Sequence, residues 1–397
     1  MAEDLTVLSL NSGSSSLKFA LHRLDEVGEV LLADGAIEGI GLQGGKLWVR
    51  AGADRNEREE PARNHRAAAH LIFAELATHG RRAPDAVGHR VVHGGVGHSA
   101  AARATPELME TLHGLVPLAP LHLPNEIAVI EECARQFPNI PQVACFDTEF
   151  HRRMPEVAQH YPLPRQYWDT GVRRFGFHGI SYEYIVETLG RAARGRVIIA
   201  HLGNGSSLAA VKDGSSVDTT MGFTPAGGLM MGTRTGDIDP GVIVHALREL
   251  RLDAEAIDRL VNHESGLFGV SGTTSDMKTL LERRGADARA SLAIDLFCYQ
   301  LVKHAGALAA VLGGLDLLVF TGGIGEGAAP IREQICRGLG YLGVAIDDAL
   351  NASHAETISS ASSRCAVKII PTREDLMIAR HTRRMIIASS GSRRSQS

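Results

Sequence analysis

The feature of this sequence that most limits its fold is a pair of similar glycine- and serine-rich hairpins, one in each half of the chain. In the first, the apolar runs Thr6 to Leu10 and Leu17 to Leu21 flank the polar turn NSGSSS. In the second, Arg196 to Leu202 and Leu208 to Val211 flank GNGSS. Aligning the serine pairs gives an offset of 206 − 15 = 191 residues, close to half of 397. The spacing predicts a duplicated domain.

The length of the chain also favours two domains, because single cores stop growing at about 250–300 residues. A formal net charge of −4 excludes a broad basic surface for nucleic acid. Five cysteines without a Cys-x-x-Cys pair fit a reducing compartment. The start MAEDLTVLSL does not resemble a secretory signal, and the longest apolar stretch, Ala305 to Leu315, is too short to span a bilayer. We therefore expect a cytoplasmic protein without nucleic-acid or membrane partners.

A third glycine-rich run, Thr321 to Gly327, follows the apolar strand predicted at Leu315 to Phe320. Glycine and serine in tight turns bring backbone amides close to a phosphate. A single turn of this kind is more often a plain connection. Three of them at strand ends in related halves indicate a nucleotide cleft, with the third as a ligand loop.

Two arginines stand between glycines: Arg90 in GHRVVHGG and Arg234 in GGLMMGTRTGDID. These settings predict loops that expose each guanidinium, although most arginines only pair with a surface carboxylate. Phosphoryl transfer depends on positioning and on positive charge around the moving group. A guanidinium also holds a carboxylate by two parallel hydrogen bonds. We expect one arginine to anchor a carboxylate acceptor and the other to clamp the phosphoryl group.

Nine ordered motifs between Leu10 and about Thr382 resemble the acetate kinase (acetokinase) family, part of the acetate and sugar kinase, heat-shock chaperone and actin superfamily. The motifs are LNSGSSSLKF, HRVVHGG, APLH, FDT, FGFHG, HLGNG, the segment from Asp218 to Pro240, FTGGIGE and PTREDLMIAR.

The resemblance implies an α/β fold of two duplicated actin-like (ribonuclease H-like) βββαβαβα domains, with the active site in the cleft between them. It implies that residues 1–149 and 376–397 form the acid-binding domain, that residues 150–375 form the nucleotide-binding domain, and that the protein is a homodimer. The implied reaction is reversible transfer of the γ-phosphoryl group of ATP to acetate, with Mg²⁺ as cofactor and Mn²⁺ as a substitute.

The resemblance assigns roles residue by residue. Arg90 falls where the family holds the acid carboxylate, and His178 and Arg234 fall where it contacts the phosphoryl group in transit. His122 lies beside them, and Asp147 is expected to orient magnesium or its waters. Because the acid arrives ionised, no general base is needed. The metal positions are Asn11 and Glu374.

Two further sets of positions match the family pattern. The positions expected around ATP are Lys18, His201, Leu202, Gly203, Asn204, Gly205, Asp276, Met277, Lys278, Gly323, Ile324, Gly325, Glu326 and Gly327. The positions expected around the methyl end of the acid are Val92, Leu121, Phe177 and Pro225.

Five residues depart from the family pattern: Leu123, Tyr182, Lys278, Gly327 and Arg373. Leu123 and Tyr182 leave room for a shifted acid preference, and Lys278 and Gly327 affect the expected nucleotide affinity and base preference. Propionate or butyrate therefore stays open as the acceptor. A different class, an actin-like ATP switch without an acceptor, also stays open. A sugar kinase would need a base to deprotonate a hydroxyl and has no use for Arg90.

Overall fold

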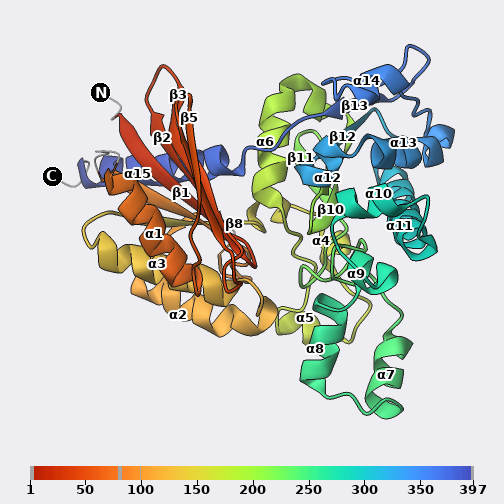
Figure 1. Ribbon diagram of the computed structural model, residues 1–397, viewed down its shortest axis with the longest axis horizontal. Helices are drawn as coiled ribbons and strands as arrows, with labels where there is room; N and C mark the ends of the chain where they lie inside the picture. Colours follow the sequence, from red (N-terminus) through yellow and green to blue (C-terminus); the bar gives the residue numbers. More distant parts are fainter. Residues whose placement is uncertain (1–3, 79–82, 99, 395–397) are drawn as a thin grey trace. The chain divides into compact units, whose positions relative to one another are not determined.

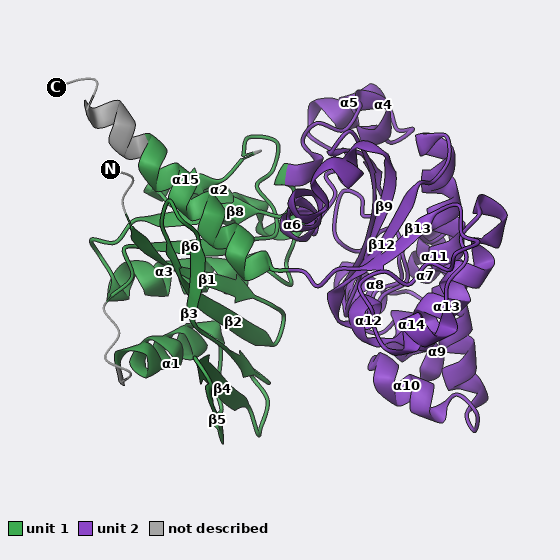
Figure 2. Ribbon diagram, turned by 90° about the horizontal axis from the view of Figure 1, so that it is seen from above, with its two compact units in different colours: residues 1–149, 373–397 green, residues 150–372 purple. Residues whose placement is uncertain are grey.

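The computed structural model of the chain describes residues 4–78, 83–98 and 100–394, with side chains up to residue 388. It divides into two compact units, coloured separately in Figure 2: residues 1–149 with 373–397, and residues 150–372. None of the helices in these described stretches is long and apolar enough to cross a membrane.

The first unit is built on an eight-stranded sheet of order β5-β4-β3-β2-β1-β6-β8-β7 (Figure 1). β1, β2 and β3 pair antiparallel, whereas β1, β6 and β8 run parallel. The strands are β1 (Leu5–Ser12), β2 (Ser16–Leu24), β3 (Glu29–Glu38), β4 (Lys46–Ala51), β5 (Asp54–Glu59), β6 (Ala86–Val91), β7 (Ala102–Arg103) and β8 (Gln142–Phe146).

Helices cover both faces of this sheet. Leu8 and Leu10 of β1 pack in one apolar cluster with side chains of α1 (His65–Thr78) and α3 (Leu123–Gln136). Between them, Ser9 donates a hydrogen bond to the carbonyl of Asp375, at the start of α15 (Glu374–Arg394). Because side chains alternate along a strand, α15 covers the opposite face. The remaining long helix of the unit, α2 (Pro106–Leu115), packs on α3.

The second unit repeats this plan in a five-stranded sheet of order β11-β10-β9-β12-β13. The five-strand stretch β3-β2-β1-β6-β8 of the first sheet corresponds, strand by strand, to β11-β10-β9-β12-β13 of the second. The parallel and antiparallel pairings are also the same. The strands are β9 (Arg196–Leu202), β10 (Ser206–Lys212), β11 (Ser215–Thr219), β12 (Leu317–Thr321) and β13 (Ala366–Ile369). The prediction of two duplicated actin-like units is confirmed.

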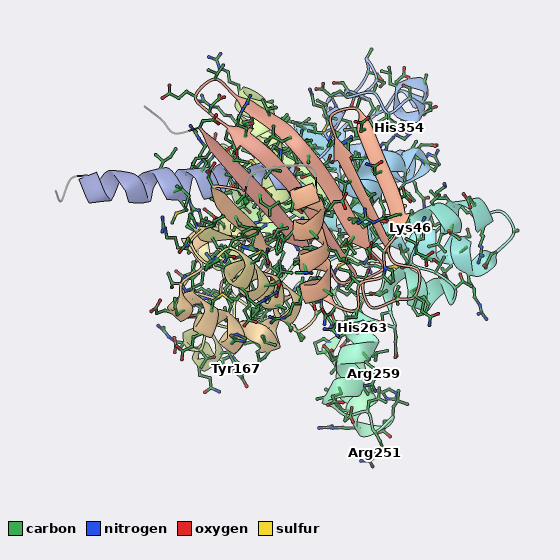
Figure 3. The ribbon with its side chains drawn as sticks, turned by 60° about the vertical axis from the view of Figure 1, so that its left-hand side comes forward. Lys46, Tyr167, Arg251, Arg259, His263 and His354 are labelled. Carbon is green, nitrogen blue, oxygen red and sulfur yellow. The ribbon has the colours of Figure 1, made fainter. Side chains whose placement is uncertain are left out.

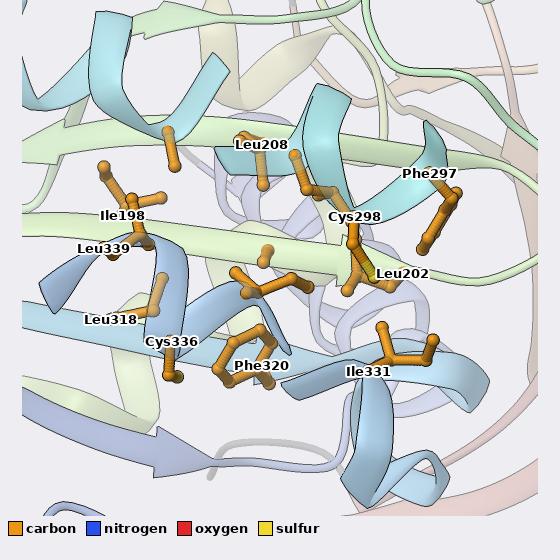
Figure 4. Close-up of a cluster of buried hydrophobic side chains, with 14 of the residues drawn as sticks. Ile198, Leu202, Leu208, Phe297, Cys298, Leu318, Phe320, Ile331, Cys336 and Leu339 are labelled. Carbon is orange, nitrogen blue, oxygen red and sulfur yellow. The ribbon is translucent and has the colours of Figure 1, made fainter. Parts of the chain in front are cut away.

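The main core of the second unit lies between its sheet and two helices, α11 (Ala288–Leu312) and α13 (Ala329–Gly338). Figure 4 shows this cluster, with Phe320 of β12 among side chains from both helices. α11 begins where the Asp287 carboxylate accepts two backbone N–H bonds and ends at Gly313, whose φ of 73° suits glycine. The shorter helices are α4 (Glu156–Gln159), α5 (Arg165–Asp169), α7 (Pro240–Arg248), α8 (Ala254–Asn262), α9 (Gly266–Ser271), α10 (Met277–Arg283), α12 (Gly322–Gly327) and α14 (Asp348–Ala352).

One face of each sheet is covered by a helix that comes, in the sequence, after the last strand of the other sheet. After β8 the chain enters the second unit, where Tyr182 and Ile185 of α6 (Gly179–Leu189) pack on β9 and β10. After β13 it re-enters the first unit as α15. The sequence analysis expected the chain to return to the first domain at residue 376, which lies inside α15. The structure divides the two units at Arg373 instead.

The expectation that Thr321 to Gly327 forms a loop is wrong. Thr321 ends β12, Gly322 adopts a φ of 77°, and the run continues as the short helix α12. A Cβ on Gly322 would lie 2.7 Å from the carbonyl oxygen of Leu202, so glycine is required for this turn. The turn places α12 beside the end of β9.

Candidate active site

In the first unit, the candidate residues gather where parallel strands end. Asn11 lies near the end of β1, Arg90 near the end of β6, and Asp147 directly after β8. Carboxyl ends of neighbouring parallel strands meet at one edge of a sheet, where ligands of open α/β folds bind. The helix starts at His122 and Glu374 add the N-terminal ends of α3 and α15.

Arg90 is held by the protein's own carboxylates. Its Nε and Nη2 donate to the two oxygens of Asp147 at 3.1 and 2.5 Å, and its Nη1 lies 3.9 Å from Glu126 Oε1. Burial alone would lower the pKa of Arg90, but the charges of Asp147, Glu374 and Glu126 outweigh it and raise the pKa. Arg90 is therefore a permanent cation whose two-donor edge is occupied by Asp147.

The expectation of an exposed guanidinium is wrong for both arginines, and the expectation of a loop is wrong for Arg90 but right for Arg234. Arg90 lies within strand β6 with a side chain 12% exposed, and Arg234 is 9% exposed. Each guanidinium has acceptors nearby that offset its burial: Asp147 for Arg90, and the carbonyl of Pro225, 2.7 Å from Arg234 Nη1. The glycines around them allow close packing rather than exposure.

Glu126 is a site residue that the sequence analysis missed. Its carboxylate is 2% exposed and accepts the backbone N–H of Val92 at 3.0 Å. Burial raises its pKa to about 8, although Arg90 and the Val92 amide act in the opposite direction. Its position among Leu123, Ile127 and Ile130 on the buried face of α3 is the signal that could have identified it, because isolated acids rarely occupy core positions.

Asn11 and Glu374 form a pair suited to magnesium. Asn11 Nδ2 donates to Glu374 Oε2 at 2.7 Å, and amide and carboxylate oxygens are the hard ligands that magnesium prefers. Across the hairpin, the register partner of Asn11 is the exposed Lys18. No cluster of three or more His, Cys, Asp or Glu side chains suited to a metal occurs in the described part of the chain. This donor set fits a magnesium ion completed by substrate phosphates, as is usual in kinases.

In the second unit, His178 has an unusual backbone. It precedes α6 in the left-handed region, with φ 58°, which is uncommon for residues other than glycine. Its ring stacks on that of His201, with centroids 4.2 Å apart. Its Nδ1 lies 2.8 Å from the Ser207 hydroxyl. His178 is thus held beside His201, at the carboxyl end of β9.

Arg234 and His178 converge on the second hairpin. A Cβ on Gly205 would lie 3.0 Å from Arg234 Nη2 and 3.3 Å from His178 Nε2. The loop that carries Arg234 reaches the hairpin because Gly232 donates to the carbonyl of Asn204 at 3.0 Å. At Gly232 a Cβ would lie 2.0 Å from Asn204 Oδ1 and 3.3 Å from the Asn204 carbonyl oxygen, so a larger residue there would displace the Asn204 side chain. Two nitrogen-bearing side chains therefore face one glycine turn.

Two polar residues lie behind these histidines: Ser181, which the sequence analysis missed, and Tyr182, which it named only as a departure from the family pattern. Tyr182 is fully buried, and its hydroxyl forms a short hydrogen bond with Ser207, the partner of His178. Ser181 lies 2.9 Å from His201 Nδ1. Both lie on the first turn of α6, where a polar side chain facing a sheet needs a partner. The spacing of Ser181 and Tyr182 from His178 along the helix is the signal in the sequence that could have identified them as partners of the two histidines.

The residues expected around ATP differ in where they lie and in which of their side chains can face a ligand. His201 to Gly205 form the end of β9 and its turn, and α12 lies at the same edge because Thr321 and His201 are register partners. Glu326 faces the protein: its Oε1 accepts from Gly322 and Thr372 amides at 2.8 and 3.3 Å.

The segment Asp276 to Lys278 starts α10. Asp276 caps this helix, and hydrogen bonds from Thr279 lower its pKa. Met277 is a core residue, so only its backbone and the exposed Asp276 and Lys278 side chains can face a ligand.

The expected apolar pocket is divided between the units. Val92 is buried and Leu121 half-buried in the first unit, whereas Phe177 is buried and Pro225 half-buried in the second. His122 is the half-buried residue before α3, and its carbonyl accepts from the Glu126 amide at 3.1 Å. The pocket and the role of His122 stay predictions.

Comparisons with known proteins identify the family of the chain. Residues 6–380 match the model of the acetokinase family. The acetate kinase of Rhodopseudomonas palustris (strain ATCC BAA-98 / CGA009) is 46% identical over 391 residues, covering 96% of this chain and 98% of the relative. The acetate kinase of Carboxydothermus hydrogenoformans is 41% identical over 399 residues, covering 96% and 100%.

Solved structures give the same result. Porphyromonas gingivalis acetate kinase has a TM-score of 0.83 at 38% identity, covering 96% of this chain and 100% of that one. A propionate kinase from Francisella tularensis subsp. tularensis SCHU S4 has a TM-score of 0.89 at 36% identity, covering 96% and 99%. By its fold, its motifs and these full-length matches, the chain belongs to the acetokinase family.

Proposed function

We propose that the chain catalyses reversible, magnesium-dependent transfer of the γ-phosphoryl group of ATP to acetate, giving acetyl phosphate and ADP. The observation that carries this proposal is the convergence of Arg234 Nη2 and His178 Nε2 on Gly205, within a glycine turn of the expected nucleotide site. Two N–H donors at a phosphate-binding turn are suited to stabilising charge on equatorial phosphoryl oxygens. Membership of the acetokinase family supports the acceptor.

The reaction needs no proton transfer. An oxygen of ionised acetate attacks the γ-phosphorus in line, and the bond from that phosphorus to the β–γ bridging oxygen breaks. The bridging oxygen leaves with its electron pair on ADP. Arg90 supplies positive charge for the acetate, and Arg234 and His178 for the phosphoryl group. The turns at Gly203 to Gly205 and at α12 orient the donor. Asn11 and Glu374 would hold magnesium, which neutralises phosphate charge when bound.

Arg90 is proposed to attract the acid without a bidentate clamp. Its Nε and Nη2 are committed to Asp147, so the acid carboxylate meets the Nη1 side of the guanidinium. Asp147 thereby orients the arginine as well as any metal-bound water. The apolar residues Val92, Leu121, Phe177 and Pro225 are proposed to hold the methyl end and to limit chain length.

Hydroxylamine trapping tests the reaction. Purified protein with MgATP and acetate should give acetyl hydroxamate, and the Arg234→Ala variant should give far less. No acid-dependent hydroxamate from folded wild-type protein would refute the proposal. Release of ADP at a rate indifferent to acetate would instead support an ATP switch without an acceptor.

Propionate is the second candidate acceptor, favoured by the propionate kinase among the similar structures and by the buried Tyr182 at a departing motif position. Relative kcat/KM values for acetate, propionate and butyrate decide between them. One methylene changes discrimination by about 1–3 kcal/mol. A kcat/KM higher for propionate than for acetate would reassign the enzyme.

The protein is further proposed to act in the cytoplasm as a homodimer. The exposed apolar side chains of Val242, Leu247 and Leu250, on and just after α7, support a surface that pairs with a second copy. Light scattering after size-exclusion chromatography measures the mass, and a monomer at all concentrations would contradict the dimer.

A further inference from the structure

Arg332 is the largest fully buried side chain in the described part of the chain. It lies on α13, whose buried face also carries Ile331, Ile335 and Cys336. Ile331 and Cys336 are seen in Figure 4 as part of the apolar core. A guanidinium at such a position is exceptional, because charged side chains are almost never fully buried unless paired.

The hydrogen-bond partners of Arg332 carry no formal charge. Nε and Nη2 donate to Asn351 Oδ1 and to its carbonyl oxygen at 2.8 and 2.9 Å. Nη1 donates to the carbonyls of Gly325 and Glu326 at 2.9 and 2.8 Å. Among the residues that the structure describes, no carboxylate forms an ion pair with Arg332. Burial lowers its pKa, but an arginine remains charged.

His354 is the remaining neighbour. Its Nδ1 lies 3.1 Å from Arg332 Nη2 and 3.0 Å from the Glu326 carbonyl. Its side chain is exposed and can be located in Figure 3. A neutral ring either accepts from the arginine or donates to the carbonyl through Nδ1, so it adds no negative charge.

These contacts connect Arg332 to the glycine run of the proposed nucleotide site. Two of its acceptors, the Gly325 and Glu326 carbonyls, belong to α12, and Gly323 and Gly327 of the same helix are exposed. One end of α12 is fixed by Glu326, which accepts the Gly322 amide at 2.8 Å. Arg332 thus lies directly behind the exposed glycines.

We propose that Arg332 is the positioning residue of the nucleotide site and that the nucleotide polyphosphate is the counter-charge of its buried guanidinium. The inference rests on the proposed function, since it requires a nucleotide at α12. Removing one member of a buried charge pair is costly because the other is left uncompensated. Phosphate-dependent affinity therefore depends on the charge of residue 332.

The test compares ADP with adenosine. Arg332→Gln should weaken ADP binding by about 30-fold or more, as for loss of a desolvated charge partner. Adenosine binding should change by less than about 3-fold, because adenosine carries no phosphate. Isothermal titration or ligand-detected NMR measures both without any acid present. Arg337→Gln, an exposed arginine on the same helix, is the matched control and should bind both ligands like the wild type.

Arg332→Lys keeps the charge but has fewer donors, and it covers the case in which the glutamine variant does not fold. It should bind ADP within about 5-fold of the wild type, because charge compensation is retained. A larger ADP loss in Arg332→Lys, or equal losses for ADP and adenosine in Arg332→Gln, would overturn the inference. Wild-type protein that binds no ADP would instead remove the proposed function.

Discussion

Asp147 occupies the Nε and Nη2 edge of Arg90, with N–O distances of 3.1 and 2.5 Å. This edge is the one that usually binds a ligand carboxylate by two parallel hydrogen bonds. The second acid, Glu126, lies 3.9 Å from Nη1. The cation proposed for the acetate is therefore also the charge partner of the buried Asp147 carboxylate.

Replacing Arg90 by alanine should both weaken acetate binding and destabilise the protein. The KM for acetate rises because its cation is lost, and the free energy of unfolding falls by about 3–5 kcal/mol because the buried Asp147 carboxylate loses its partner. Steady-state kinetics and urea unfolding measure the two effects. Unchanged stability with a raised KM would show that Asp147 does not need Arg90.

Arg234→Ala should act mainly on kcat. Removing a transition-state donor lowers kcat by about 100-fold or more, with little change in KM for acetate. Arg251→Ala, a surface position labelled in Figure 3, is the control. A raised KM at normal kcat would mean that Arg234 binds the ground state instead.

Tyr182→Phe removes the hydroxyl that bonds Ser207 and so loosens the orientation of His178. Loss of one hydrogen bond of about 1–1.5 kcal/mol should lower kcat by about 5- to 10-fold and leave KM for ATP unchanged. Tyr184→Phe on the same helix should behave like the wild type. Equal kcat values for both variants and wild type would show that His178 does not depend on this contact.

Removing either member of the Asn11 and Glu374 pair should raise the magnesium requirement. For Asn11→Ala and Glu374→Gln, the Mg²⁺ concentration for half-maximal activity should rise at least about 10-fold, as is typical when a metal site is disturbed. Glu356→Gln, at an exposed ion pair with Lys368, serves as control. An unchanged magnesium titration would exclude the pair as the metal site.

Glu126→Gln should change how stability depends on pH. The folded pKa of Glu126, about 8, lies above the ordinary value of 4.5. Its contribution to stability is therefore full below pH 4.5 and is lost as pH rises through about 8.

A glutamine does not titrate. The free energy of unfolding of the variant, relative to that of the wild type, should therefore rise by about 1.4 kcal/mol per pH unit between pH 5 and 8. Urea unfolding at several pH values measures the difference. Glu110→Gln on α2 is an exposed control, and parallel profiles for Glu126→Gln and wild type would contradict the prediction.

The sequence was sufficient for features that depend on local pattern. The hairpin strands β1, β2, β9 and β10 follow from apolar runs around glycine turns, and the motifs place Arg90, His178 and Arg234 at strand ends or turns. The structure describes what these side chains contact within each unit.

The sequence was insufficient for contacts that depend on how helices pack on the sheets. Glu126 reaches Arg90 only because α3 packs beside β6, and nothing in the spacing of the two residues shows it. Likewise, the sequence does not show that a glycine run continues as helix α12, because its first turn depends on Leu202 and Glu326.

The late position of α15 affects how the protein is made. Leu376, Met377 and Ile378 cover strands β1 and β6, which a ribosome completes hundreds of residues earlier. Until the final helix emerges, the amino-terminal sheet has an uncovered apolar face. Residues 150–372, by contrast, contain both their sheet and the helices α6, α11 and α13 that pack against it. Synthesis therefore favours an order of folding in which the middle of the chain is completed before its beginning.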